Sequence, residues 1–179
     1  MGLKVIITGA KPIDKFAIAK KLVEINDNLS IAPTFTSDKD YEGIVSDKMY
    51  YMSTEDVILA FKNNVILYIN TDVYISHGIT IDNFYNNDIF VMDLDDFNSI
   101  SDHNIAGQDI LVVWVDTKHY DDIHIKNSDI TESKYLTERL ENIPYMYFLD
   151  TDVESIAKTI NSYIEGDDEE KLAIIEENN

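Results

Sequence analysis

Apolar runs alternate along this chain with segments in which apolar residues recur every three or four positions. Three strongly apolar, β-rich runs are typical of strands buried on both faces, at residues 4–8, 89–95 and 110–115. Helical spacing recurs in five segments, at residues 12–25, 57–63, 80–86, 131–142 and 152–164. Buried strands separated by helices predict an α/β fold, a three-layer sandwich with a mainly parallel sheet.

Weaker patterns predict the remaining elements. Short strands are expected at residues 29–32, 48–52, 65–70 and 145–149, with a polar loop at 33–40 and a turn at Gly78. Ser53, with Asp56 three residues later, predicts the N-terminal cap of the second helix. Residues 165–179 are acidic and are expected to form an extended or fraying tail. The alternative is a short helix at 171–175 that docks on a partner.

A tight turn follows the first predicted strand. Gly9 ends the strand, and Pro12 suits the first turn of a helix, where a missing N–H costs nothing. A strand, a glycine turn and a helix opening with lysines form the setting of a phosphate-binding loop. Against the pattern of Gly, four residues, Gly, Lys and Ser or Thr, Gly9 and Lys15 are in register. Asp14 replaces the second glycine, and Phe16 replaces the hydroxyl residue.

Both replacements weaken a phosphate site. Asp14 restricts the backbone that would wrap the phosphate and adds a negative charge there. Phe16 cannot ligate Mg²⁺ as a hydroxyl does. Two interpretations remain open: a working loop in which Gly9, Lys11, Asp14 and Lys15 bind the nucleotide, or a strand–turn–helix start without a ligand.

Charge narrows the range of partners. The 179 residues suffice for one domain, and they carry 34 acidic against 14 basic residues, a formal net charge of −20. This field repels nucleic acid, and the single arginine, Arg139, leaves few fork-shaped donors for phosphate. Cysteine is absent, which excludes disulfides and thiolate chemistry. With no apolar run of membrane-span length and no secretory signal pattern, we expect a cytoplasmic protein that binds neither membranes nor nucleic acid directly.

A few carboxylates and histidines are candidate metal ligands. Asp93 and Asp95 lie at a predicted strand end, where a Mg²⁺ site or a merely solvated terminus is possible. Residues 119–124 hold two imidazoles and two carboxylates, but their spacing is not that of a helical zinc pair, so an exposed loop is expected. His77 and His103 stand isolated in the sequence, and we assign them no site.

The order of elements over about residues 3–164 resembles the guanylate kinase family. The matching segments are residues 30–37, 50–56, 62–64, 74–78 and 93–95. The resemblance implies a P-loop NTPase architecture in a single domain of residues 1–164. It further implies a nucleotide-monophosphate-binding-like subregion at about 30–80, a lid-like region at about 116–142, and an acidic tail at 165–179.

The resemblance also implies roles for individual residues. Substrate-binding positions would be Thr36, Lys39, Tyr50, Tyr68 and Asp95, metal ligands Asp93 and Asp95, and catalytic residues Lys15 and Arg139. The family's arginines that grip the monophosphate have no counterpart around residues 36–40, where Lys39 is the only cation. The glutamate that recognises guanine falls at Tyr68, which cannot accept two base N–H groups.

Phosphoryl transfer depends on positioned cations, so these departures bear on function. We expect a guanylate kinase-like domain, a pseudokinase with a degenerate Walker A motif, that has lost efficient phosphoryl transfer and works as a binding or interaction scaffold for a protein partner. One alternative is an active, divergent (deoxy)nucleoside monophosphate kinase that uses ATP and Mg²⁺ to phosphorylate GMP or another monophosphate. A weaker alternative is a regulatory subunit whose acidic surface mimics nucleic acid for a basic partner.

Overall fold

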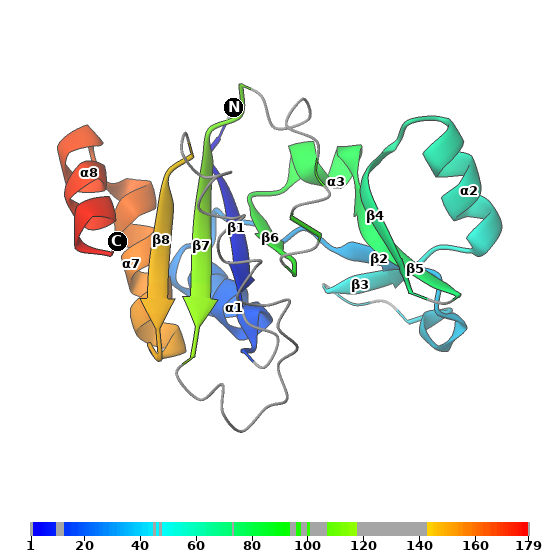
Figure 1. The fold of residues 1–179 in the computed structure, drawn as a ribbon, viewed down its shortest axis with the longest axis horizontal. Helices are drawn as coiled ribbons and strands as arrows, with labels where there is room; N and C mark the ends of the chain where they lie inside the picture. Colours follow the sequence, from blue (N-terminus) through cyan, green and yellow to red (C-terminus); the bar gives the residue numbers. More distant parts are fainter. Residues whose placement is uncertain are drawn as a thin grey trace, which may run out of the picture.

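A computed structural model describes residues 2–9, 13–44, 46, 48–72, 74–93, 96–97, 100, 107–117 and 143–178. Its strands form two four-stranded sheets that lie beside each other (Figure 1). The first sheet has the order β6-β1-β7-β8 and is parallel throughout; its strands are β6 (Ile89–Val91), β1 (Lys4–Gly9), β7 (Ile110–Asp116) and β8 (Tyr145–Leu149). The predicted parallel sheet is therefore confirmed.

The second sheet is mixed. It has the order β3-β2-β5-β4, and its strands are β3 (Met49–Tyr51), β2 (Thr34–Thr36), β5 (Ile75–Thr80) and β4 (Ile66–Asp72). Strands β2 and β3 pair in parallel, whereas β5 pairs antiparallel with both β2 and β4. All four strands fall within the residues for which a nucleotide-monophosphate-binding-like subregion is predicted.

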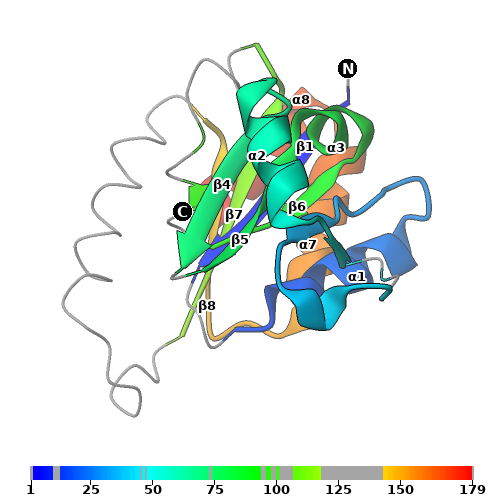
Figure 2. The ribbon, with the colours of Figure 1, turned by 90° about the vertical axis from the view of Figure 1, so that its right-hand side faces the viewer.

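Two apolar clusters cover the two faces of the parallel sheet. On one face, α1 (Lys15–Ile25) and α7 (Val153–Glu165) pack over alternate residues of β1 and β7. On the other face, α3 (Ile81–Asn86) and residues of β4 and β5 share a core with the sheet. The outer helix α2 (Thr54–Lys62) lies over the mixed sheet (Figure 2), and η1 (Lys39–Tyr41) is a single 3₁₀ turn.

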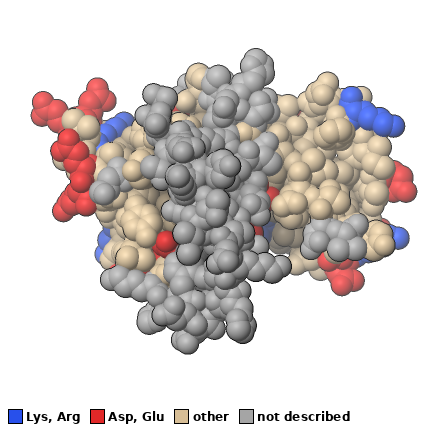
Figure 3. Space-filling model, in the orientation of Figure 1, with Lys and Arg blue, Asp and Glu red and all other residues tan. Residues whose placement is uncertain are grey.

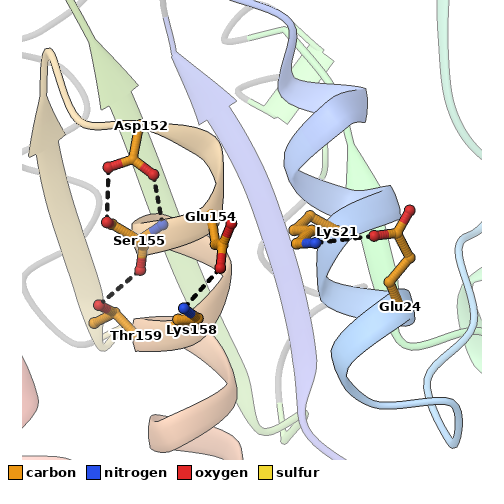
Figure 4. Close-up of polar contacts among 7 residues, drawn as sticks. All are labelled: Lys21, Glu24, Asp152, Glu154, Ser155, Lys158 and Thr159. Carbon is orange, nitrogen blue, oxygen red and sulfur yellow. Dashed lines mark hydrogen bonds and ion pairs between the residues drawn. The ribbon is translucent and has the colours of Figure 1, made fainter.

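Local polar contacts explain where the helices begin. Asp152 caps α7 by accepting hydrogen bonds from the backbone N–H and the hydroxyl of Ser155, at 2.9 and 2.7 Å (Figure 4). Glu154 pairs with Lys158 one turn later, at 2.7 Å. Ser53 caps α2 and hydrogen-bonds to Asp56, which confirms the predicted cap.

Three predictions for the first 40 residues are wrong: a helix boundary, a strand and a loop. Helix α1 begins at Lys15 rather than at Pro12, because the side chain of Asp14 is its N-terminal cap. Residues 29–32 form no strand. Ile31 makes only an isolated bridge to Ile89, and β2 lies in the segment predicted to be a polar loop.

Gly78 is not at a turn; it lies inside β5. A Cβ atom at this position would overlap the carbonyl oxygen of Tyr68 and press on the ring of Phe35. The glycine is therefore explained by close approach of neighbouring strands and not by turn geometry.

The acidic end of the chain also differs from its prediction. Residues expected to be extended form α8 (Asp168–Glu177), which opens with a capping box between Asp167 and Glu170. Ile174 and Ile175 pack against the cluster around α7, so the apolar pair anchors the helix to its own domain. Acidic residues in the first turn are favourable there because they face the positive end of the helix dipole.

Within the part of the chain that the structure describes, no helix is long and apolar enough to cross a membrane. The predicted helix at residues 131–142, the loop at 119–124 and His103 lie outside the described residues.

Candidate functional site

The candidate site begins where β1 ends. Gly9 has a φ of +132°, and a side chain there would overlap the backbone of Val115 on the neighbouring strand β7. Glycine is therefore required for the chain to leave the sheet at this point. Lys11, which is predicted to contribute to phosphate binding, lies outside the described residues.

Asp14 is the N-terminal cap of α1, at the helix start where the sequence predicts phosphate binding. Its Oδ1 accepts a hydrogen bond from the backbone N–H of Ala17 at 3.1 Å. The exposed N–H groups of a helix N-terminus are the donors that bind anions. Here one of these donors is occupied by the chain itself, because the N–H of Ala17 is shared between this carboxylate and the carbonyl oxygen of Asp14 at 3.1 Å.

The candidate phosphate-binding lysine is buried and paired. Nζ of Lys15 lies 3.1 Å from Oδ1 of Asp93 and 3.4 Å from the carbonyl oxygen of Gly9. Asp93 follows β6, the strand next to β1, so both residues lie near the carboxyl ends of neighbouring parallel strands. This is the edge at which open α/β sheets bind ligands.

Phe16 stands where the family pattern has a hydroxyl. The ammonium groups of Lys20 and Lys48 lie 5.2 and 5.1 Å from the centre of its ring. These distances are within the range of cation–π contacts. The position thus supplies an aromatic surface for two lysines and no oxygen ligand for Mg²⁺.

A second polar cluster joins the mixed sheet to the segment after β6. Asp96 is only 4% exposed; its Oδ1 accepts from Nδ2 of Asn70 at 3.0 Å, and its Oδ2 lies 3.5 Å from Nε2 of His77. The prediction that His77 is isolated is wrong. Asn70 and His77 are cross-strand partners in the β4–β5 hairpin, so that register is the signal that could have placed them together.

Thr36 belongs to the same row of the mixed sheet. It is the β2 partner of His77, and paired residues on neighbouring strands point to the same face. Thr36 is buried, and its hydroxyl accepts a hydrogen bond from the N–H of Asp38 at 3.2 Å. The row of Thr36, His77 and Asn70 therefore ends at the carboxylate of Asp96.

Tyr68 adds an aromatic hydroxyl near this acidic segment. Burial raises the pKa of Tyr68 far above its ordinary value, and the nearby charges of Asp96 and Asp93 raise it further. The side chain is therefore a neutral phenol at physiological pH. A neutral phenol can donate one hydrogen bond, whereas the glutamate expected at this position would accept two.

The other predicted substrate residues are placed less centrally. Tyr50 lies on β3, where its hydroxyl accepts from Nδ2 of Asn83 at 3.4 Å and where burial raises the pKa of its phenol. Lys39 is exposed in η1, whose cap is Asp38. Asp95 and Arg139 lie outside the described residues.

The side chains of the described residues do not form a metal site. Among the described residues, no group of three or more His, Cys, Asp or Glu side chains is arranged to hold a metal ion. Asp93, one of the two predicted ligands, is paired with Lys15. Lys15, Asp93, Tyr68 and Asp96 lie in one region of the structure. The roles assigned to Lys15, Asp93 and Tyr68 from the sequence stay predictions.

Comparison with known proteins gives a match at the level of structure. No protein-family model and no curated protein matches the chain. Among solved structures, the guanylate kinase from Anaplasma phagocytophilum is similar, with a TM-score of 0.58 and 13% sequence identity over 91% of this chain and 84% of that one. At this identity the likeness shows the fold alone. The chain therefore has a guanylate kinase-like fold, with a parallel sheet beside a mixed sheet.

Proposed function

We propose that this chain is a guanylate kinase-like domain that has lost efficient phosphoryl transfer and acts as a binding or interaction scaffold. The observation that carries the proposal is the hydrogen bond from the N–H of Ala17 to the carboxylate of Asp14. A nucleotide phosphate at the start of α1 would meet a fixed negative charge and one fewer free donor.

The charge balance around Lys15 supports the same proposal. Its ammonium is already paired with Asp93, so the region presents little net positive charge to a triphosphate. Catalysis of phosphoryl transfer relies on cations placed over the transferring group. Removing one such cation can cost orders of magnitude in rate.

The acceptor side lacks the expected cations as well. In the segment formed by β2 and η1, the only basic residue is Lys39, and its side chain is exposed. A lysine presents a point charge, whereas the planar fork of an arginine binds phosphate through two parallel hydrogen bonds. A monophosphate would therefore be bound weakly at this position.

One observation favours the alternative, an active divergent nucleoside monophosphate kinase. Lys15 and Asp93 lie near the carboxyl ends of adjacent parallel strands, the general ligand-binding edge of such sheets. If the pair opens, Lys15 could meet a phosphate and Asp93 a Mg²⁺ ion.

Isothermal titration of Mg²⁺–ATP and of GMP into the purified chain separates the two functions. We expect no heat of binding at millimolar ligand for the natural sequence. The variant Asp14→Gly removes both the charge and the side-chain cap on the N–H of Ala17, and Asp14→Asn keeps the cap but removes the charge. If both variants bind ATP more strongly than the natural sequence, the negative charge of Asp14 is what prevents binding. If only the glycine variant does, the hydrogen bond of the cap is what prevents it.

The control is Lys15→Ala. Heat from ATP with the natural sequence that disappears in Lys15→Ala would contradict the proposal, because it would show that the phosphate loop works. Binding that survives the substitution would point to a contact elsewhere on the chain.

A further inference from the structure

Helix α2 presents an apolar surface to solvent. Four large apolar residues on and just after this helix are exposed: Ile58 by 49%, Leu59 by 57%, Phe61 by 61% and Val65 by 38%. Val57 alone is buried from this helix. Figure 2 shows α2 in front of the mixed sheet, on its outer side. An exposed patch of this kind on a short helix is typical of an interaction site.

The charged residues of α2 bracket this patch. Glu55, Ile58, Leu59 and Lys62 follow the spacing i, i+3, i+4 and i+7, so they share one stripe along the helix. The acidic residue lies at one end of the stripe, the basic residue at the other, and the apolar pair in the middle. No ion pair joins Glu55 or Lys62 to any residue in the described part of the chain.

This stripe is complementary to itself. A two-fold axis placed between Ile58 and Leu59 sets Glu55 of one chain opposite Lys62 of the other, and Ile58 opposite Leu59. The same operation repeats each contact on the other side of the axis, as in any isologous dimer. We propose that the chain self-associates through α2, as an antiparallel pair of helices from two copies. This inference is independent of whether the candidate site binds a nucleotide.

The distribution of charge is compatible with such a pair. Each chain carries a net charge of −20, which opposes association. Helix α8 holds five acidic residues and one lysine, and it lies at the end of the molecule opposite α2 (Figures 1 and 3). A dimer through α2 therefore keeps the two acidic α8 helices at its far ends. At physiological salt the Debye length is about 8 Å, so repulsion over that separation is largely screened.

The small area of the apolar surface on α2 limits the affinity of the proposed dimer. A stable interface buries about 800 Å² on each partner. One helix of nine residues with Val65 is smaller than that, so the association is weak and depends on protein concentration.

Sedimentation velocity over a concentration series at about 0.15 M salt measures this association. We expect the sedimentation coefficient to rise with concentration for the natural sequence. Leu59→Glu should raise the dimer dissociation constant at least about tenfold, a loss of about 1.4 kcal/mol. Leu172→Glu, at a comparably exposed leucine on α8, is the matched control and should leave the dissociation constant unchanged.

Charge reversal tests the geometry. Glu55→Lys alone places lysines opposite each other twice across the axis, and Lys62→Glu alone does the same with glutamates, so each should weaken the dimer. The double variant restores opposite charges and should recover association. Circular dichroism of each variant checks that α2 remains folded, since both substitutions also oppose the helix dipole.

Three results would overturn the proposal. A concentration-independent monomer would exclude self-association, and a dimer that Leu59→Glu leaves intact would place the contact elsewhere. A double charge variant weaker than either single variant, with intact helix content, would exclude the antiparallel register.

Discussion

Nζ of Lys15 lies 3.1 Å from Oδ1 of Asp93, and this pair joins the start of α1 to the segment after β6. Lys15 is 7% exposed, whereas Asp93 is 49% exposed. The lysine is therefore the more buried member of the pair, and burying an ammonium group is costly unless its charge is paired.

Asp93→Asn should destabilise the fold by about 1–2 kcal/mol, between the cost of breaking an exposed pair and that of breaking a buried one. The measurement is urea unfolding followed by circular dichroism. Lys15→Met removes the buried charge as well, so Asp93→Asn should cost less when made in that background. Equal costs in both backgrounds would show that the pair contributes nothing to stability.

The raised pKa of Tyr68 should make the folded chain less stable at alkaline pH. The pKa of its phenol is higher in the folded chain than the ordinary value of 10.0, because of burial and the charges of Asp96 and Asp93. The folded state therefore holds this proton more tightly than the unfolded state. The resulting stabilisation is fully present below pH 10 and is lost as the pH rises above it.

Tyr68→Phe isolates this effect from the other buried tyrosines. Urea unfolding at about pH 8 and about pH 11 should show a smaller difference in unfolding free energy for the variant than for the natural sequence. Equal differences would mean that Tyr68 does not hold its proton in the folded state.

Two substitutions in the cluster around Asp96 should lower stability by different amounts. Asp96→Ala should cost about 1–3 kcal/mol, because Asn70 loses its acceptor and His77 loses its neighbouring carboxylate. Asn70→Ala removes a single hydrogen bond and should cost less, about 1 kcal/mol. Thermal unfolding of the two variants checks the order; the reverse order would place the main interaction of Asn70 elsewhere.

Helix α8 should be integral to the domain. The N–H of Tyr147 donates to the carbonyl oxygen of Asn178 at 2.9 Å, and Ile174 and Ile175 pack on the core. Removing residues 167–179 would uncover this edge of β8, and exposed strand edges promote aggregation. We expect a loss of about 2–4 kcal/mol from the buried isoleucine surface, together with increased light scattering on heating.

Leu172→Asp provides the control for that truncation. Leu172 is 60% exposed on the same helix, so its replacement should change the unfolding free energy by less than about 0.5 kcal/mol. A truncated chain as stable and as soluble as the full one would mean that α8 only rests on the surface.

The parts of the fold that could be predicted are those whose signal is local and strong. Strand β1 is buried at every position, and such a run has few alternatives to a central parallel strand. Ser53 and Asp56 gave a helix start because a cap acts over three residues. The order of elements along the sequence predicted the guanylate kinase-like fold, and the similarity to a solved guanylate kinase structure confirms it.

The parts that could not be predicted depend on partners far away in sequence. Strand β2 is only three residues long and forms because β3 and β5 pair with it. The many acidic residues of α8 favoured the prediction of an extended tail, although Ile174 and Ile175 pack this helix against the core. His77 lies on β5 and Asp96 lies in the segment after β6, so their contact depends on the tertiary fold and no local sequence pattern indicates it.

An assay of phosphoryl transfer tests most directly whether this domain has lost kinase activity. The purified chain is incubated with Mg²⁺–ATP and each nucleoside monophosphate in turn, and ³¹P NMR follows the formation of ADP and the new diphosphate. We expect no diphosphate above the level seen with Lys15→Ala. Diphosphate that forms catalytically with the natural sequence, and not with Lys15→Ala, would contradict it and establish an active kinase.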